Sequence, residues 1–280
     1  TLSLVSPSKN AVNVSPAISI YCNDIDAPRY QVMRDTSAFF NSPMLIDTSS
    51  TWFGIGNINL RYGASYYWKI RAFTDYDSTA WTSVRKFTVI DTISYPNPAN
   101  IAVNQNVSLS LGFANINGSR FFDFELDTVI SMSSPFLQHL SNSSSSVAVS
   151  NLEYGRTYYW RARARTVSDS TRWSQVFRFT TNNAITLVSP ANNATATAVN
   201  LTLDCSDITG STSYQFELDT SASFSSPLAT IVDSTISKAN SGYLRYGAKY
   251  YWRARAISSN DTTSWSAARI FTTKNSLTFV

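Results

Sequence analysis

The chain is poor in the residues that most catalytic sites require. Its 280 residues include one histidine, two cysteines and few charged side chains, which make up 14% of the sequence, compared with about 25% in typical soluble domains. The histidine, His139, lies in a serine-rich stretch, and we interpret it as a solvated loop residue rather than a general base. We therefore expect no enzymatic activity and no cofactor.

An excess of one charge and a long apolar run are also missing. The formal net charge is +4, and basic and acidic residues are nearly balanced in each third of the chain, so we expect no nucleic-acid partner. No apolar stretch is long enough to cross a membrane. Cys22 and Cys205 are interpreted as small buried apolar groups rather than as a disulfide. These absences favour a structural or binding role.

Short polar side chains and apolar residues make up most of the sequence instead. Serine and threonine number 44 and 29, and hydrophobic residues make up 43%. This apolar fraction is sufficient for a folded core. The abundance of serine and threonine favours strands and loops over helices, which prefer alanine, leucine, glutamate and lysine.

One segment occurs three times at an interval of 92 residues. The copies YGASYYWKIRA, YGRTYYWRARA and YGAKYYWRARA begin at Tyr62, Tyr154 and Tyr246. The same interval separates four further landmarks: Trp81, Trp173 and Trp265; Asp35, Asp127 and Asp219; Pro43, Pro135 and Pro227; Phe87, Phe179 and Phe271. Agreement among all these landmarks establishes three tandem copies of one module.

Within each module, apolar and polar residues alternate, which predicts half-buried strands. The inward positions of the strongest strand in the first module are Tyr66, Trp68, Ile70 and Ala72. No stretch has a sustained helical period. We therefore predict an all-β chain of three tandem immunoglobulin-like β-sandwiches, each with seven short strands.

The strongest strand resembles the sixth strand of fibronectin type III modules. That family opens the strand with Leu-x-Pro-Gly-Thr-x-Tyr, and the chain matches it, with Tyr62 in place of the proline, at Leu60, Gly63, Tyr66, Trp68, Ile70 and Ala72. The resemblance implies a tyrosine corner, in which the hydroxyl bonds a nearby backbone group, at Tyr66, Tyr158 and Tyr250. The chain departs from the family on the second strand, where Cys22, Phe113 and Cys205 replace a core tryptophan.

The repeat interval sets the expected module boundaries. Fibronectin type III-like repeats are expected at residues 1–91, 92–183 and 184–275, and residues 276–280 match the first strand of a further repeat. Linkers of only a few residues leave little freedom between modules. At about 3.3 Å per strand residue, three modules in a stiff rod extend on the order of 100 Å.

The outward face of the sixth strand carries basic residues in every module: Lys69 and Arg71, Arg161 and Arg163, Arg253 and Arg255. They form either a ligand-binding stripe or cross-strand ion pairs, for which the third strand supplies Asp123, Glu125 and Glu217. Trp81, Trp173 and Trp265, each followed by serine or threonine, resemble half of the Trp-Ser-x-Trp-Ser motif of cytokine-receptor modules. That resemblance implies tryptophan rings layered with arginines, so we favour the structural interpretation.

Aspartate is followed by serine or threonine at 9 of 15 positions. Two segments, FELDTSASFSSPL and YGxxYYWRARA, resemble modules of large secreted proteins of Bacteroidetes bacteria. Six of the steps are similar to the O-glycosylation motif of such proteins: Ser78, Thr92, Thr128, Ser170, Ser234 and Thr262. Turn formation by aspartate explains the same pattern, and the sequence leaves both interpretations open.

Two other groups of residues are weaker candidates for binding. Trp52 and Phe53, in the segment TWFGIG, have no counterpart in the other modules and are candidate ligand-binding residues, although we favour a core or interdomain role. The pairs Asp24/Asp26 and Asp75/Asp77 are too few for calcium, which takes six to eight oxygens. We interpret them as turn residues and expect no metal site.

Repetition without a divergent copy favours a structural or adhesive stalk of a secreted or cell-surface protein. The expected partners are neighbouring repeats, with surface glycans or other proteins as further candidates. The alternative is a set of spacer or carbohydrate-binding modules attached to a secreted hydrolase or protease. Sequence on either side of these modules separates the two hypotheses.

Overall fold

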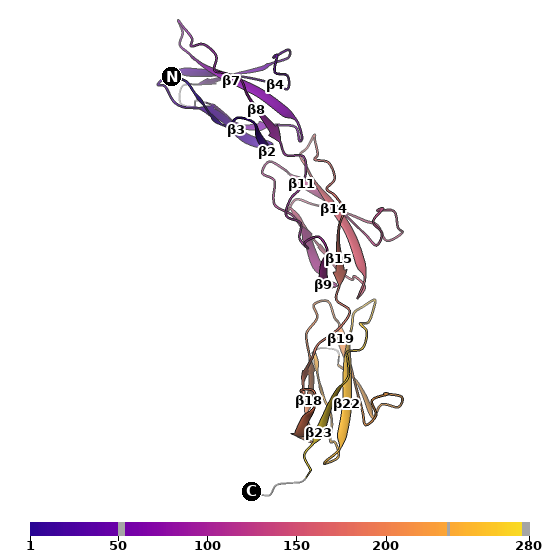
Figure 1. The fold of residues 1–280 in the computed structure, drawn as a ribbon. Helices are drawn as coiled ribbons and strands as arrows, with labels where there is room; N and C mark the ends of the chain where they lie inside the picture. The colour runs from indigo at the N-terminus through magenta and orange to yellow at the C-terminus, as the bar shows by residue number, and fades with distance from the viewer. Residues whose placement is uncertain (50–53, 234–235, 276–280) are drawn as a thin grey trace.

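The computed structural model describes residues 1–49, 54–233 and 236–275. Within these ranges every regular element is a β-strand, and no helix there is long and apolar enough to cross a membrane. The strands form separate sheets, and these sheets pack into three modules arranged end to end in an elongated row (Figure 1). Residues 276–280, Trp52, Phe53 and Ser234 lie outside the described residues.

The first module is a sandwich of two sheets. Its strands are β1 (Leu4–Ser6), β2 (Ala11–Val14), β3 (Ala17–Cys22), β4 (Arg29–Asp35), β5 (Met44–Ser49), β6 (Gly54–Asn59), β7 (Ser65–Phe73) and β8 (Arg85–Val89). The sheet orders are β1-β3-β6 and β2-β8-β7-β4-β5. β1 and β2 are two pieces of one edge strand that changes sheets, and β2 runs parallel to β8. Counted as one, they bring the total to the seven strands that the sequence predicts.

The second module repeats this plan. Its strands are β9 (Ala102–Gln105), β10 (Leu109–Gly112), β11 (Phe121–Asp127), β12 (Gln138–Asn142), β13 (Ser146–Val149), β14 (Thr157–Arg165) and β15 (Phe177–Thr181). The larger sheet has the order β12-β11-β14-β15-β9, and the smaller pairs β10 with β13. The expectation that His139 lies in a loop is wrong. It lies on edge strand β12, with its Nδ1 3.1 Å from a carboxylate oxygen of Glu125.

The third module has the same two sheets. Its strands are β16 (Leu187–Ser189), β17 (Ala194–Thr197), β18 (Thr202–Cys205), β19 (Ser213–Asp219), β20 (Ala229–Asp233), β21 (Lys238–Asn240), β22 (Lys249–Ile257) and β23 (Arg269–Thr273). The sheet orders are β16-β18-β21 and β17-β23-β22-β19-β20. The chain is therefore all-β and consists of tandem immunoglobulin-like sandwiches, as predicted.

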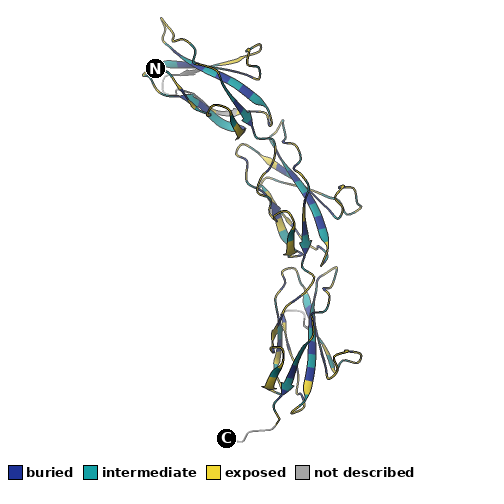
Figure 2. Ribbon diagram, in the orientation of Figure 1, coloured by how far each residue is buried: buried dark blue, intermediate teal, exposed yellow. Residues whose placement is uncertain are grey.

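The alternating pattern of the sixth strand builds each core. On β7, β14 and β22 every second side chain is buried, which Figure 2 shows as alternating colours along these strands. Trp68, Trp160 and Trp252 are fully buried there, as the sequence predicts. Cys22 and Cys205 are buried, 183 residues apart, in the cores of the first and third modules. Burial raises the pKa of the Cys22 thiol to about 11 and that of Cys205 to about 12.

The tyrosine corner is confirmed in all three modules. The hydroxyl oxygen of Tyr66 accepts a hydrogen bond from the backbone N–H of Arg61 at 3.0 Å. Tyr158 and Tyr250 accept equivalent bonds, five residues upstream, at 2.9 and 3.0 Å. Each bond anchors the turn that precedes the sixth strand to the core of its module. It therefore fixes the position of the tyrosine at the tip of that turn: Tyr62, Tyr154 or Tyr246.

Candidate functional site

On the outward face of the sixth strand, basic side chains stack on a tryptophan ring. In the second module, the guanidinium carbons of Arg161 and Arg163 lie 4.9 and 4.6 Å from the ring centre of Trp173. The third module has the same pair of contacts on Trp265, at 4.6 and 4.5 Å. In the first module Lys69 and Arg71 take these places beside Trp81. The layering that the sequence predicts is therefore present in every module.

Acidic residues on the neighbouring strand pair with this basic face in the second and third modules, whereas in the first Arg71 donates to the side-chain oxygen of Gln31 at 2.9 Å. Arg161 lies 2.6 Å from Glu125, and Arg163 lies 2.9 Å from Asp123. In the third module Arg253 lies 2.6 Å from Glu217. Because these arginines are already paired and stacked, the face stabilises the sheet rather than presenting unpaired positive charge.

The contacts that recur between modules centre on the tyrosine of the Tyr-Gly turn. We call the end of a module that carries this turn its trailing end, and the end that faces the preceding module its leading end. Tyr62 and Tyr154, which each meet a following module, are 8% and 7% exposed, whereas Tyr246 is 45% exposed. The environment of this tyrosine is therefore set by contact with the next module.

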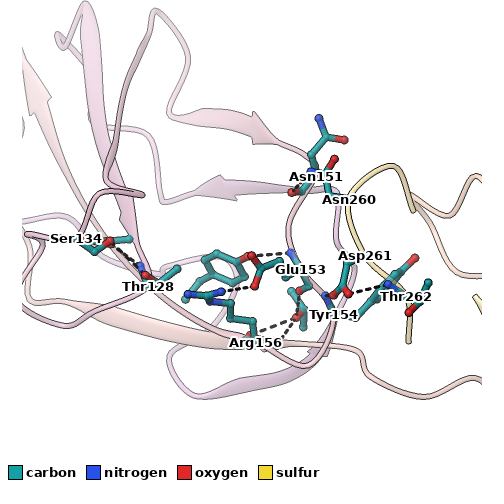
Figure 3. A network of polar contacts seen from close by, with 12 residues as sticks. Thr128, Ser134, Asn151, Glu153, Tyr154, Arg156, Asn260, Asp261 and Thr262 are labelled. Carbon is teal, nitrogen blue, oxygen red and sulfur yellow. Dashed lines mark hydrogen bonds and ion pairs between the residues drawn. The ribbon is translucent and has the colours of Figure 1, made fainter. Parts of the chain in front are cut away.

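The first junction contact joins a backbone N–H to a carboxylate. The N–H of Tyr62 donates to a side-chain oxygen of Asp169 in the second module, at 2.8 Å. The N–H of Tyr154 donates to Asp261 in the third module, also at 2.8 Å. Figure 3 shows the second of these junctions, with Asp261 placed between Tyr154 and Thr262. A hydrogen bond to a charged acceptor is stronger than one between neutral groups.

The second contact uses the phenol of the same tyrosine. The hydroxyl of Tyr62 lies 2.7 Å from the hydroxyl of Ser119, and that of Tyr154 lies 3.0 Å from Ser211. Burial raises the pKa of both phenols, although the serine hydrogen bonds oppose the shift. The neutral phenol is therefore the form that fits the junction.

The third contact comes from the linker itself. A carboxylate oxygen of Asp91 accepts a hydrogen bond from the backbone N–H of Arg172 at 3.3 Å, and the Arg172 side chain lies 2.6 Å from the other oxygen. In the next linker, Asn183 accepts from the backbone N–H of Ser264 at 3.3 Å. The turn, through its backbone and its phenol, and the linker thus contact the following module at three separate points.

Glycine lets the linker pass close beneath the turn. Gly63 and Gly155 have φ of +69° and +65°, a conformation that disfavours other residues. A Cβ on Gly63 would lie 2.8 Å from Cγ of Asp91, and one on Gly155 would lie 2.7 Å from Cγ of Asn183. Any larger residue would push the linker away from the turn.

A tight loop after the sixth strand holds the acceptor carboxylate. In the second module the N–H of Thr166 donates to the carbonyl of Asp169 at 2.8 Å, and the N–H of Asp169 donates to the Thr166 hydroxyl at 3.0 Å. Ser258 and Asp261 make the same pair of bonds in the third module, at 2.8 and 3.1 Å. These bonds orient the aspartate before the modules meet.

The proposed O-glycosylation residues differ in accessibility. Ser78, Thr92 and Thr262 are exposed, Thr128 and Ser170 are half-buried, and Ser234 is outside the described residues. Asp77, Asp127 and Asp261 each accept a hydrogen bond from the N–H of the residue that follows, so turn formation occurs at these steps. Glycosylation itself stays a prediction.

The paired aspartates of the first module have partners within the protein. Asp24 accepts hydrogen bonds from the hydroxyl of Tyr30 at 2.8 Å and from the N–H of Asp26 at 2.9 Å. Asp75 forms an ion pair with Arg29. In the part of the chain that the structure describes, no group of three or more potential ligands is placed to hold a metal ion.

Comparison with known proteins adds little to this geometry. No protein-family model matches the chain, and no curated protein matches it in sequence. Among solved structures, the crystal structure of chicken CNTN1 FN1-FN3 domains is similar over 98% of this chain and 97% of its own, with 9% sequence identity and a TM-score of 0.30. The fold assignment rests on the strand order described above.

The repeated segments that begin at Tyr62, Tyr154 and Tyr246 and the excess of Asp-Ser/Thr steps are both visible in the sequence, but nothing in the sequence connects them. Tyr62 and Asp169 are 107 residues apart, and so are Tyr154 and Asp261. This separation is one repeat of 92 residues plus 15. Any two landmarks of a 92-residue repeat keep such a constant separation, so the spacing carries no signal of its own and the contact is shown only by the structure.

Proposed function

We propose that these modules form a non-catalytic, stiff structural stalk. The observation that supports this proposal is the recurrence of the same contacts, from turn and linker, at both junctions. Contacts at three separate points oppose both bending and twisting between two rigid bodies. The order of the modules in Figure 1 is the extended arrangement that such junctions favour.

Small interfaces are sufficient for this role because the modules are covalently linked. A hydrogen bond to a charged group contributes about 1.5–3 kcal/mol, and one between neutral groups contributes about 0.5–1.5 kcal/mol. A short linker keeps the two surfaces at an effective concentration in about the millimolar range. The junction therefore has to supply only a few kcal/mol to hold one orientation.

The proposed setting is the cell surface or the extracellular medium, in a secreted bacterial protein. The uncharged serine- and threonine-rich composition supports it, as does the exposure of Ser78, Thr92 and Thr262 at Asp-Ser/Thr steps. The same rigidity suits a spacer between other domains. The arginine faces of the second and third modules carry their own acids, and Arg71 of the first module is hydrogen-bonded to Gln31. They give no support to carbohydrate binding, and we favour the stalk.

Small-angle X-ray scattering of dilute protein tests the proposal. The unmodified chain is expected to scatter as one extended, rigid particle, and Asp169→Ala combined with Asp261→Ala is expected to scatter as a flexible chain with a broader range of dimensions. Asp77→Ala is the matched control, because Asp77 occupies the equivalent loop of the first module and takes no part in either of the two junctions described. Flexibility in the unmodified chain, or equal effects of the control and the double variant, would contradict the proposal.

A further inference from the structure

A cavity lies between the trailing end of the first module and the leading end of the second. Its volume is about 390 Å³, within the range of about 300–1,000 Å³ that is typical of small-molecule sites. Its polar lining comes from both modules: Asn59 and Arg61 from the first, and Arg120, Ser168 and Asp169 from the second. A molecule bound in this cavity would therefore contact both modules at once.

At the second junction, hydrogen bonds span the corresponding positions. The side-chain amide of Asn260 donates to the carbonyl of Asn151 at 3.2 Å, and the hydroxyl of Ser259 donates to the side-chain oxygen of Asn151 at 3.3 Å. Figure 3 shows Asn151 and Asn260 beside each other across this junction. The loop after the sixth strand of the third module is thus held directly against the second module.

These hydrogen bonds have no equivalents at the first junction, because the loop residues differ there. The three corresponding residues lie one repeat earlier in the sequence: Asn59, Val167 and Ser168. Among the described residues, the side chains of Asn59 and Ser168 have no hydrogen-bond partner, and Val167 is 76% exposed. The space that hydrogen bonds close at the second junction is therefore open at the first.

Two arginines without partners border this open space. Arg61 and Arg120 are exposed, and in the described part of the chain neither guanidinium group takes part in an ion pair, a hydrogen bond or a stack on an aromatic ring. Both lie outside the paired arginine faces of the sixth strands. Of the residues that line the cavity, Asp169 alone is acidic, and it already accepts the N–H of Tyr62. Because two positive charges face one negative charge, the cavity has a net positive charge.

The second junction has the opposite charge at one of these positions. Glu153 and Thr212 lie where the first junction has Arg61 and Arg120, and Glu153 is paired with Arg156 of its own module. An anion is attracted by the two arginines of the first junction and repelled by the glutamate of the second. The charges therefore confine an anion site to the first junction.

The lining of the cavity suits a small anion that also carries hydroxyl groups. A guanidinium group binds a carboxylate through two parallel hydrogen bonds, and the side chains of Asn59 and Ser168 both donate to and accept from hydroxyl groups. Val167 supplies an exposed apolar surface for a carbon ring. An acidic sugar such as a hexuronate has a carboxylate, several hydroxyl groups and a ring with C–H faces, so it matches each part of this lining.

We propose that the cavity between the first and second modules binds an acidic saccharide. Its carboxylate lies between Arg61 and Arg120, and its hydroxyl groups bond to Asn59 and Ser168. Because the two arginines belong to different modules, the bound anion links these modules and stabilises the orientation in which they meet. The proposal goes beyond the stalk function, since binding is measured directly and does not depend on the stiffness of the chain.

Nuclear magnetic resonance of nitrogen-15-labelled protein tests the proposal, with D-glucuronate as the probe. Low ionic strength limits the screening of exposed charges. Under this condition, titration is expected to shift the backbone and guanidinium N–H signals of Arg61 and Arg120, with a dissociation constant of about 1 mM. Arg61→Gln and Arg120→Gln are each expected to weaken binding about tenfold, because each removes a charge-assisted contact.

Two further variants serve as controls for charge and for space. Arg245→Gln is expected to leave the affinity unchanged, because Arg245 occupies the position of Arg61 in the third module and is also exposed and without a partner among the described residues. Ser168→Asn keeps both arginines but introduces the amide with which Asn260 bridges the second junction. It is expected to close the cavity and to weaken binding about tenfold or more.

Two further titrations separate the parts of the ligand. D-Glucose, which lacks the carboxylate, is expected to cause no shifts at Arg61 and Arg120. Sodium acetate, which lacks the ring and its hydroxyl groups, is expected to bind about tenfold more weakly than D-glucuronate. Equal affinities for acetate and D-glucuronate would overturn the assignment of a saccharide. An absence of shifts at about 10 mM D-glucuronate, or binding that Arg61→Gln and Arg120→Gln leave unchanged, would overturn the site itself.

Discussion

Replacing the tryptophan at the centre of one module separates two contributions to its core. Trp160 is fully buried, with its ring centre 5.1 Å from that of Phe177. Trp160→Ala is expected to destabilise the second module by about 3–5 kcal/mol, because it leaves a large cavity. Among the described residues, the indole N–H of Trp160 has no hydrogen-bond partner, and an unpaired buried donor costs about 1–3 kcal/mol. Trp160→Phe removes that donor and keeps a ring, so its expected cost is about 1 kcal/mol or less.

Guanidinium titration followed by hydrogen-exchange mass spectrometry measures this effect module by module. Peptides from β14 report on the second module, and peptides from β7 and β22 in the same sample serve as controls, because Trp68 and Trp252 are intact. An unchanged midpoint for Trp160→Ala would refute the inward placement of the ring. Equal losses for Trp160→Phe and Trp160→Ala would refute the argument from the unpaired N–H.

Three further predictions concern thiols, pH and glycans. Cys22 and Cys205 are expected to resist thiol reagents in the folded chain and to react once it is denatured; denatured protein without two free thiols would contradict their assignment. Because burial raises the pKa of Tyr154, its contribution to the junction is complete below the unfolded value of about 10 and is lost as pH rises above it. The same holds for Tyr62 at the first junction. Scattering should therefore show loosening only above about pH 10, and Tyr62→Phe combined with Tyr154→Phe should abolish that dependence; equal loosening in the double variant would argue against it. In protein from its native source, peptides that contain Ser78, Thr92, Thr128, Ser170, Ser234 and Thr262 are expected to exceed their sequence mass by whole glycan units, and bare peptides throughout would rule out modification at these residues.

The modules were predictable because their patterns are local and repeated. Alternation along the sixth strand places Tyr66 and Trp68 inward, and both are buried in the structure. The resemblance to fibronectin type III modules implied the tyrosine corner, whose bond spans only five residues. The pairing of the arginines could be predicted because they occupy outward-facing positions of the sixth strand and because acids such as Glu125 lie on the adjacent strand.

The junctions were not predictable from these patterns, because hydrophobic periodicity and secondary-structure propensity describe only contacts within a module. Tyr154 and Asp261 are polar or amphipathic turn residues, which local reasoning assigns to solvent. Their contact depends on how two folded modules meet, which no local pattern of the sequence indicates. His139 was misplaced for a related reason. A serine-rich stretch predicts a loop, although serine-rich sequences also occur on edge strands such as the one that carries His139.

The central claim is that each junction holds one orientation between neighbouring modules. Double electron–electron resonance measures the distance between two modules directly. Spin labels are placed on cysteines introduced at Ile130 and Leu228, which are exposed in the second and third modules. The native cysteines are buried and stay unlabelled in the folded chain. The account predicts one narrow distance distribution, which broadens in Asp261→Ala. A broad distribution in the otherwise unmodified chain, or one that Asp261→Ala leaves unchanged, would contradict it.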